Sequence, residues 1–399
     1  MRLAHGGDGV TADGLFVPYT VPGDVVQIAR EGTRGRIVEI LTPGPARIRP
    51  PCKHFGTCGG CALQHVAHDA YLAWKREQVV TTLAQRGFDN APVGEIVSVP
   101  PATRRRANFK ARAGNDGVQL GFYAPNSRRL VDIHECHILV SALQKLIAPL
   151  RAALGNVLAL NESTELLATA VDAGIDLSLK LKRSRSPDFL MALSDLANAL
   201  RLARLASNGE VVAQRAQPML RVGKFEVALP VEPFLQPSAE GELILQHFVV
   251  DAVAGAKRVA DLFAGCGTFA LILAQDRRVH AVDSGGAMIE ALGAAARVSG
   301  AGAAVTTEAR DLFRRPLLAP ELERFDAVVL DPPRPGAKAQ SEALANSKVP
   351  RVVYVSCNVA SFARDARILC KGGYRLMRVT PIDQFVWSPH VELAAVFER

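Results

Sequence analysis

The sequence lacks the apolar segments that would anchor a protein in a membrane or direct it out of the cell. No run of roughly eighteen apolar residues occurs, and the first residues, Met1 to His5, contain no apolar signal core. We therefore expect a cytoplasmic protein without a membrane partner. At 399 residues, with 49% hydrophobic residues, the chain exceeds one ordinary core and predicts a globular protein of two or three domains.

Two motifs of cofactor chemistry are also absent. The cysteines do not follow the C-x3-C-x2-C spacing of radical enzymes, so a radical initiator is not expected. The dinucleotide fingerprint G-x-G-x-x-G fails because Ala270 takes the place of the third glycine. Seven cysteines without a secretory signal argue against a disulfide framework and favour metal ligation or catalysis. The formal net charge of +8 is compatible with a polyanionic partner.

Residues 1–46 consist of short β-prone runs separated by glycine and proline, such as Leu15 to Val17 and Val25 to Ile28. Closely spaced turn signals of this kind predict a small antiparallel barrel. Such a barrel either grips a nucleic-acid backbone or has a purely structural role, and the pattern is compatible with both.

A cluster of cysteines opens the central part of the chain. Cys52, Cys58 and Cys61 lie within ten residues, and a glycine pair between the last two lets the backbone fold around a metal ion or cluster. Cys136 is the natural fourth ligand, giving four thiolates for a structural iron-sulfur cluster or a zinc ion. A mixed zinc site is the alternative, and it would draw on His54, His65, His134 or His137.

Basic and aromatic residues are concentrated between positions 101 and 134, where a turn at 114–117 predicts a hairpin. Phe109, Phe122 and Tyr123 are interleaved with the basic residues. Such a ribbon suits phosphate contact with base stacking, and a solvated basic hairpin is the alternative. The basic residues are Arg104, Arg105, Arg106, Lys110, Arg112, Arg128 and Arg129.

From Arg258 the chain alternates strands and helices, which predicts a parallel sheet with helices on its faces. The first strand leads into the glycine-containing turn from Asp261 to Thr268, and Asp283 ends the next strand. With a further strand ending at Asp331, this pattern favours a nucleoside-bearing cofactor. Asp331 precedes a proline pair and would either cap a helix or contact the cofactor.

Two residues near the carboxyl end are candidates for chemistry. The run Val352 to Val355 predicts a buried strand that delivers Cys357 to its carboxyl end, where open α/β sheets gather their functional groups. A nucleophile would lie there, although free cysteine is also often buried for packing alone. Glu392 begins the last apolar strand, where an isolated acid is usually solvated.

Taken together, these motifs resemble the SAM-dependent RNA 5-methyluridine methyltransferases. The resemblance is carried by Asp261 to Thr268, Asp331-Pro332-Pro333-Arg334, Ser356-Cys357-Asn358 and His390-Val391-Glu392. The cysteine spacing resembles the subgroup with a TRAM barrel and a 4Fe-4S cluster. The resemblance implies an α/β fold whose class I, Rossmann-like SAM methyltransferase domain spans 233–399. It also implies a central α+β domain at 47–232 with the cluster and the RNA-binding surface, and a TRAM-like β-barrel, expected to be shortened, at 1–46.

The same resemblance implies roles for individual residues. Cys357 would add to carbon 6 of uracil as the covalent nucleophile, with its pKa lowered by basic or dipolar neighbours, and Glu392 would remove the proton from carbon 5. The SAM site would be formed by Gln236, Phe263, Thr268, Asp283, Asp311 and Asp331. The cluster would be held by Cys52, Cys58, Cys61 and Cys136. The family's Gln-x-Asn motif departs here to Gln236-Pro237-Ser238.

A uridine of 23S rRNA is the expected target, and a tRNA uridine is the nearest alternative. An amino-group methyltransferase would share the Asp-Pro-Pro motif, but Arg334 replaces its stacking aromatic residue and such enzymes need no nucleophilic cysteine. A non-catalytic RNA-binding factor that keeps the fold is a further alternative, weakened by the retention of Cys357 and Glu392. We expect a monomer.

Overall fold

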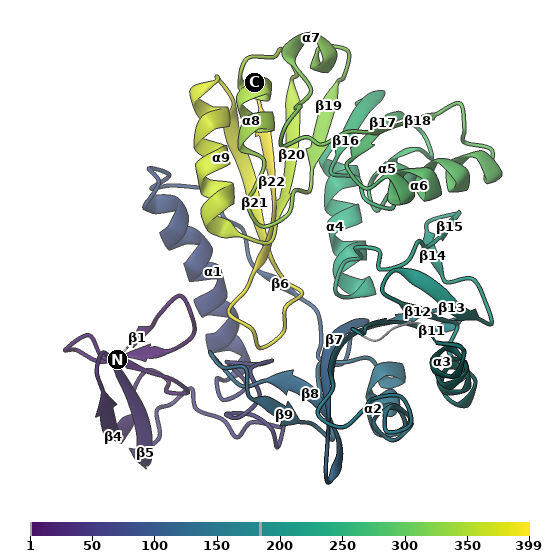
Figure 1. The fold of residues 1–399 in the computed structure, drawn as a ribbon. Coiled ribbons are helices and arrows are strands. Elements are labelled where there is room, and N and C mark those ends of the chain that lie inside the picture. The colour runs from purple at the N-terminus through teal and green to yellow at the C-terminus, as the bar shows by residue number, and fades with distance from the viewer. Residues whose placement is uncertain (1, 183–185) are drawn as a thin grey trace.

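The computed structural model describes residues 2–182 and 186–399, whose strands form four sheets. An eight-stranded sheet built mainly from the carboxyl-terminal part lies above a seven-stranded central sheet, and the amino-terminal strands lie to one side (Figure 1). In the described part of the chain, no helix has both the length and the apolar character that crossing a membrane requires.

The eight-stranded sheet has the order β18-β17-β16-β19-β20-β22-β21-β6. The first five strands in this order run parallel, and β22 is antiparallel to both of its neighbours. Because β20 is buried on both faces, the apolar run predicted from the sequence forms its centre. The strands are β6 (Val97–Ser98), β16 (Arg258–Leu262), β17 (Arg278–Asp283), β18 (Val305–Ala309), β19 (Ala327–Leu330), β20 (Arg351–Ser356), β21 (Arg375–Asp383) and β22 (Glu392–Glu398).

Helices cover both faces of this sheet, and each face has its own apolar core. One face carries α4 (Ala239–Ala252), α5 (Ala270–Leu273) and α6 (Gly286–Val298). The other carries α1 (His68–Ala84), α7 (Ala319–Leu322), α8 (Lys338–Ala345) and α9 (Val359–Lys371). The alternation of strands and helices read from the sequence therefore produces a doubly covered, largely parallel sheet.

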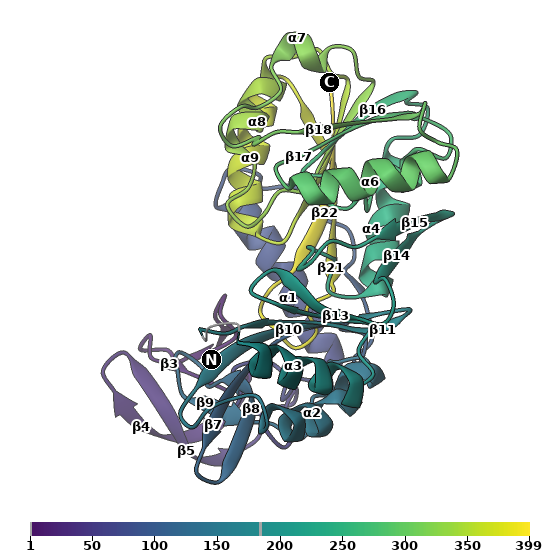
Figure 2. The same ribbon diagram turned by 45° about the vertical axis from the view of Figure 1, so that its right-hand side comes forward.

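The central sheet has the order β13-β12-β11-β10-β7-β8-β9. Its helices α2 (Ser141–Leu154) and α3 (Pro187–Ala199) pack on the side that faces away from the eight-stranded sheet (Figure 2). Its opposite face therefore looks toward the carboxyl-terminal sheet. The strands are β7 (Arg106–Gly114), β8 (Gly117–Tyr123), β9 (Leu130–Asp132), β10 (Ser163–Val171), β11 (Gly174–Lys180), β12 (Arg204–Ser207) and β13 (Glu210–Gln214).

The amino-terminal sheet has the order β1-β2-β3-β5-β4. The first three strands have two residues each, in agreement with the closely spaced turn signals of the sequence, whereas β4 and β5 have seven and nine residues. The strands are β1 (Arg2–Leu3), β2 (Gly9–Val10), β3 (Phe16–Val17), β4 (Val25–Glu31) and β5 (Arg34–Thr42). A buried ion pair between Arg47 and Asp24 joins this sheet to the segment that follows it.

Several segments cross between these parts of the chain. Helix α1 and strand β6 lie within the predicted central domain, yet α1 packs against α9 and β6 pairs with β21 of the carboxyl-terminal sheet. The hairpin of β14 (Met219–Val222) and β15 (Phe225–Ala228) also packs into a core of that sheet. Conversely, the connection between β21 and β22 of the carboxyl-terminal sheet extends down toward the central part of the chain (yellow in Figure 1). There, the Trp387 carbonyl accepts hydrogen bonds from the backbone N–H groups of Ala62 and Leu63.

Candidate active site

A crevice of about 710 Å³ lies at the carboxyl ends of the parallel strands and continues along the open face of the central sheet. Six of the eight residues predicted for catalysis and cofactor binding line it. They are Gln236, Phe263, Asp283, Asp331, Cys357 and Glu392. Strand ends at one edge of a parallel sheet converge in space, which is why residues distant in sequence meet here.

Cys357 directly follows β20 and is half-buried. The next residue, Asn358, caps α9 by accepting hydrogen bonds from the N–H groups of Ala360 and Ser361, so the strand-to-helix turn is fixed. Burial and the neighbouring carboxylates of Glu392 and Asp331 raise the pKa of Cys357 to about 11. The prediction that its neighbours lower the pKa is therefore wrong for this structure, because the cationic Arg334 is outweighed.

Glu392 is 3% exposed, so the expectation that an acid at this position is solvated is wrong. It begins β22, which lies between β20 and β21 rather than at a sheet edge. Burial and the nearby charge of Asp331 raise its pKa well above the usual value, and a hydrogen bond from the Gln384 amide opposes this. A buried carboxyl with a raised pKa is suited to proton transfer near neutral pH.

Strand register places Cys357 beside Glu392. Strands β20 and β22 are antiparallel, and their last aligned pair is Ser356 with Leu393. Continuing the register by one residue brings Cys357 opposite Glu392. The thiol and the carboxyl therefore enter the crevice from adjacent strands.

Asp331 directly follows β19 and accepts a hydrogen bond from Gln236 Nε2 at 3.0 Å. Asp331 lines the crevice, and its contact with a cofactor stays a prediction. Burial raises the pKa of Asp331 to about 7, and the hydrogen bond from Gln236 opposes that shift. Ser238 takes the place of the second amide of the family motif and caps α4 by accepting from the Gly241 N–H group.

Phe263 and Asp283 shape the turn after β16. Asp283 accepts the N–H of Gly265 at 3.0 Å and that of Gly285 at 2.7 Å, which ties the two strand-end loops together. Phe263 has a φ of 64°, a left-handed conformation that costs a bulky residue about 1–3 kcal/mol. Such strain at a crevice is consistent with a functional role for the Phe263 ring.

Thr268 and Asp311 are not among the described residues that line the crevice. The Thr268 carbonyl accepts a hydrogen bond from Gln246, whereas Asp311 accepts the backbone N–H of Phe313 at 2.9 Å. The Phe313 ring, 5.5 Å from that of Phe263, does line the crevice. Asp311 thus contacts the backbone of a residue that lines the crevice, and Phe313 itself was not predicted from the sequence although it stands two positions away.

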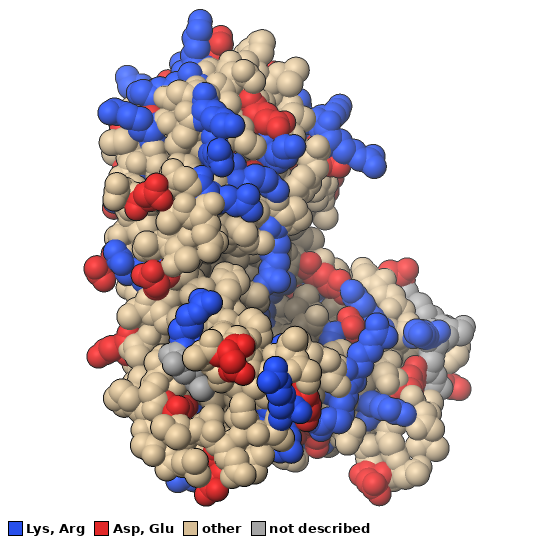
Figure 3. Space-filling model, turned by 90° about the vertical axis from the view of Figure 1, so that its left-hand side faces the viewer, with Lys and Arg blue, Asp and Glu red and all other residues tan. Residues whose placement is uncertain are grey.

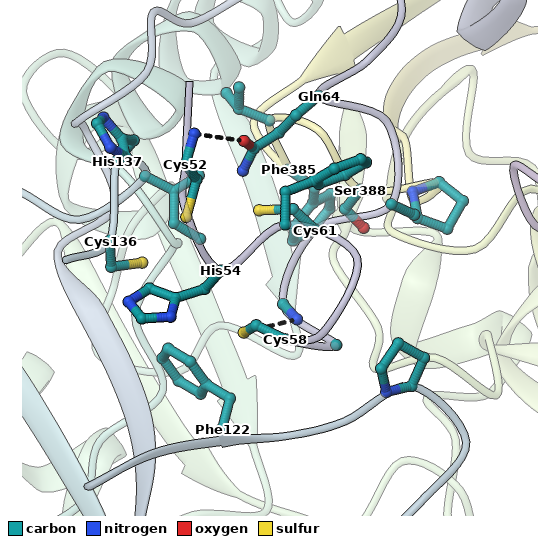
Figure 4. A pocket seen from close by; sticks show the side chains of 18 of the residues that line it. Cys52, His54, Cys58, Cys61, Gln64, Phe122, Cys136, His137, Phe385 and Ser388 are labelled. Atoms are coloured by element: carbon teal, nitrogen blue, oxygen red, sulfur yellow. Dashed lines mark hydrogen bonds between the residues drawn. The ribbon is translucent and has the colours of Figure 1, made fainter. Parts of the chain in front are cut away.

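The four predicted ligand cysteines line a second cavity, of about 980 Å³. None of the four forms a disulfide. Figure 4 shows the sulfur atoms of Cys52, Cys58, Cys61 and Cys136 arranged around one space, with the His54 ring among them. Burial raises the pKa of Cys61 to about 11 and that of Cys136 to about 12, so a cation would be needed to hold the set as thiolates.

The mixed-ligand alternative also has structural support. Ligand atoms of Cys52, Glu135 and His137 all lie within 4.8 Å of one another. His65, in contrast, is buried in an aromatic group with Tyr19 and Phe55, and its Nε2 contacts the Thr20 carbonyl. The cavity therefore offers either four thiols or a smaller set with histidine and glutamate.

The two cavities are neighbours. Arg104, Arg334 and Phe385 line both of them. Arg334 Nη2 lies 2.8 Å from Nε2 of His390, a residue of the connection between β21 and β22. The cysteine cavity and the crevice thus share part of their lining, which includes Phe385 of this connection.

Three of the basic residues predicted to contact RNA serve a structural purpose. Arg105 pairs with Glu242 at 2.6 Å, Arg106 donates to the Leu235 and Pro233 carbonyls, and Arg104 donates to the Arg106 carbonyl. Arg105 and Arg106 join the central sheet to the segment before α4, because their guanidinium groups find carboxylate and carbonyl partners there. Among the others, Arg112, Arg128 and Arg129 are exposed.

Positive charge nevertheless gathers on the surface. Figure 3 shows Lys and Arg side chains running along one face and into a hollow between two lobes of the molecule. Arg104, Arg106, Lys180 and Arg334 contribute to the lining of the crevice. A surface of this kind attracts a polyanion.

Comparison with known proteins gives a consistent result. The model of the family described as tRNA (Uracil-5-)-methyltransferase matches residues 68–399. An RNA methyltransferase of Brucella suis, itself uncharacterized, is 44% identical over 100% of this chain and 96% of its own. A 23S rRNA (uracil(1939)-C(5))-methyltransferase of Chromohalobacter salexigens is 34% identical, with 100% of this chain and 88% of that protein covered.

A solved structure supports the fold independently. The tRNA (uracil-54, C5)-methyltransferase of Pyrococcus abyssi, in complex with S-adenosyl-L-homocysteine, superposes with a TM-score of 0.78 at 23% identity. The match covers 99% of this chain and 98% of that one. The predicted Rossmann-like α/β fold is thereby confirmed.

Proposed function

Because the chain belongs to the tRNA (uracil-5-)-methyltransferase family of RNA methyltransferases, we propose that it works through a covalent bond between Cys357 and uracil. The enzyme transfers a methyl group from SAM to carbon 5 of a uridine in RNA. The observation that carries the covalent mechanism is the register of β20 and β22, which brings Cys357 opposite Glu392 in the crevice.

The chemistry requires both residues. Carbon 5 of uracil is a poor nucleophile, so the Cys357 thiolate first forms a bond to carbon 6 and pushes electrons onto the uracil ring as an enolate. SAM, when bound, supplies the methyl group that carbon 5 then takes. Glu392 removes the remaining proton from carbon 5, the C–H electrons form the 5,6 double bond, and the S–C6 bond breaks to return the thiolate.

The raised pKa values fit a protected site. Near neutral pH, burial keeps the Cys357 thiol mostly protonated and makes Glu392 a stronger base once ionised. The thiolate would therefore form mainly when the sulfonium cation of bound SAM adds favourable charge. Gln236, Phe263, Asp283 and Asp331 would bind SAM directly, while Thr268 and Asp311 would contribute through the loops that they belong to.

A release experiment tests the role of Glu392. Glu392→Gln should form a methylated enzyme-RNA adduct that persists in denaturing gels, because no base removes the carbon 5 proton. Glu398→Gln, at the other end of the same strand and in a surface pair with Arg351, is the matched control and should turn over normally. Rapid turnover by Glu392→Gln would contradict the proposed role.

The proposed target is a uridine of 23S rRNA, with tRNA as the alternative. The ribosomal RNA enzyme of Chromohalobacter salexigens, 34% identical over the whole chain, supports this choice. Mass-spectrometric mapping of RNA from a deletion strain tests it. One 5-methyluridine should be lost from 23S rRNA, and its loss from tRNA instead would favour the alternative.

We further propose a 4Fe-4S cluster at Cys52, Cys58, Cys61 and Cys136, whose free thiols line one cavity. The bound cluster would supply iron-thiolate bonds that join residues 52–61 to the connection between β9 and α2, which contains Cys136. Anaerobically purified protein should contain about four iron atoms with visible absorption. Cys58→Ser should lose iron, and Cys266→Ser, a buried cysteine outside the cavity, should retain it. Zinc without visible absorption would contradict the cluster and leave a zinc site, either at the four thiols or at Cys52, Glu135 and His137.

The remaining proposals concern organisation. Residues 1–46 would form a TRAM-like module, 47–232 the RNA-binding part and 233–399 the methyltransferase domain, in a monomer. The positive charge on the face shown in Figure 3 supports RNA contact. Footprinting on a ribosomal RNA fragment tests whether all three parts contact RNA.

A further inference from the structure

A chain of buried amide hydrogen bonds links Asp331 to Glu392. Gln236 Nε2 donates to Asp331 Oδ2 at 3.0 Å, and Gln236 Oε1 accepts from Gln384 Nε2 at 2.9 Å. The same Gln384 Nε2 donates to Glu392 Oε2 at 2.8 Å. The side chains of Gln236, Gln384 and Glu392 are all at most 4% exposed, so water does not compete for these bonds.

The hydrogen-bonding capacities at the two ends determine the orientation of both amides. An ionised Asp331 can only accept, so Gln236 must direct its nitrogen to Asp331 and its oxygen to Gln384. Gln384 must then present its nitrogen, whose two hydrogens serve Gln236 and Glu392. Glu392 is held as an acceptor through Oε2, which leaves Oε1 without a contact from Gln384.

The structure holds Gln384 in place from two sides. On the backbone side, the buried Lys75 of α1 pairs with Asp383 and donates to the Phe385 carbonyl at 3.0 Å. Tyr71 donates to Asp383 at 2.5 Å. These contacts flank Gln384 on both sides along the chain.

On the side-chain side, Gln384 lies against the first turn of α4. A Cβ atom at Gly241 would lie 2.5 Å from Gln384 Oε1 and 2.9 Å from its Cβ, so only glycine leaves room for the amide. Gln384 Oε1 has no hydrogen-bond partner among the described residues. The hydrogen bonds of the Gln384 amide are therefore the two that its nitrogen donates, to Gln236 and to Glu392.

We propose that Gln384 is a positioning residue that fixes the carboxyl group of Glu392 for proton removal from carbon 5 of the methylated uracil adduct. The inference rests on the proposed function of Glu392. In this role Gln384 acts through Glu392 and not on the reacting atoms, and it meets the proposed SAM site only through its hydrogen bond to Gln236. It keeps Oε2 of Glu392 engaged and favours the ionised form, which alone can accept the proton.

The test separates adduct formation from adduct release. Gln384→Met keeps the side-chain volume but cannot donate, and it should form the methylated adduct at the wild-type rate. Release should be slower by about ten- to hundredfold, the range expected when a hydrogen bond to a charged group is lost. The covalent complex should therefore accumulate in denaturing gels.

The pH profile of release provides a readout that a general loss of stability would not change. Without the donor, release by Gln384→Met should require a higher pH than release by the wild type, because the ionised carboxylate is less favoured. Asp331 is the other ionisable group whose charge acts on Glu392, and it is unchanged in the variant, while the Cys357 sulfur is bonded to carbon 6 in the adduct and does not ionise. Gln340→Met, which removes another buried glutamine amide bonded to the Leu317 backbone, is the control and should release normally.

Gly241→Ala provides a second route, since it should displace the Gln384 amide without altering it and produce the same release defect. Wild-type release with a wild-type pH profile in both variants would overturn the proposal. If Gln384→Met does not fold, the release rate and pH profile of Gly241→Ala alone decide whether the proposal holds. Glu392→Gln separates this proposal from the one on which it rests: if that variant fails to trap the adduct, the assignment of the base is wrong, whatever Gln384 does.

Discussion

Replacing Lys75 with methionine should destabilise the enzyme strongly, although Lys75 lies outside the crevice. The Lys75 side chain is 0% exposed and that of Asp383 is 1% exposed, so their ion pair is fully removed from water. Burial lowers the pKa of Lys75 to about 8, while the charge of Asp383 opposes the shift. Removing one partner of such a pair leaves an uncompensated buried charge and costs about 3–5 kcal/mol.

The magnitude can be worked out further with a double substitution. In Lys75→Met combined with Asp383→Leu, no buried charge is left, so much of the lost stability should return, to within about 1–2 kcal/mol of wild type. Urea denaturation followed by circular dichroism measures both variants. A cost for Lys75→Met below about 1 kcal/mol, or a double variant no more stable than the single one, would refute the reasoning.

Two other predictions concern charge. Burial raises the pKa of Asp331 from 3.8 to about 7, so ionisation of Asp331 lowers the stability of the folded enzyme as pH rises between about 4 and 7. The difference in stability between Asp331→Asn and wild type should therefore favour the variant more at pH 8 than at pH 5. Urea denaturation at both pH values measures this difference. Charge reversal of the exposed Arg128 and Arg129 should weaken RNA binding and flatten its salt dependence, which filter binding at several salt concentrations measures. Arg105→Ala, which breaks a largely buried ion pair with Glu242, should instead lower the midpoint of thermal unfolding. An unchanged salt slope in the charge-reversal variant would count against RNA contact at Arg128 and Arg129.

The sequence predicted those features of the site that depend on local patterns. The apolar run before Cys357 specifies a buried strand, and strands of a parallel sheet present their carboxyl ends at one edge. These two patterns predict that Cys357, Asp283 and Asp331 lie together, and all three line the same crevice. The family resemblance added Glu392, whose burial the local pattern did not reveal.

Features that depend on distant contacts could not be predicted. Lys75 and Asp383 are 308 residues apart, and nothing near either residue indicates its partner. The basic run at 104–106 appeared suited to RNA, but tertiary contacts with residues 233–242 use two of its guanidinium groups for structure. The pKa of Cys357 was wrongly expected to fall, since the sequence shows the cationic neighbour Arg334 but not the burial that outweighs it.

The covalent role of Cys357 is tested most directly by RNA that contains 5-fluorouridine at the target position. Fluorine at carbon 5 cannot leave as a proton, so the adduct should be trapped as a stable enzyme-RNA complex in denaturing gels. Wild type should form this complex in the presence of SAM, and Cys357→Ala should not. A wild-type enzyme that methylates ordinary RNA but forms no complex with the fluorinated RNA, or a Cys357→Ala variant that forms one, would contradict the covalent mechanism.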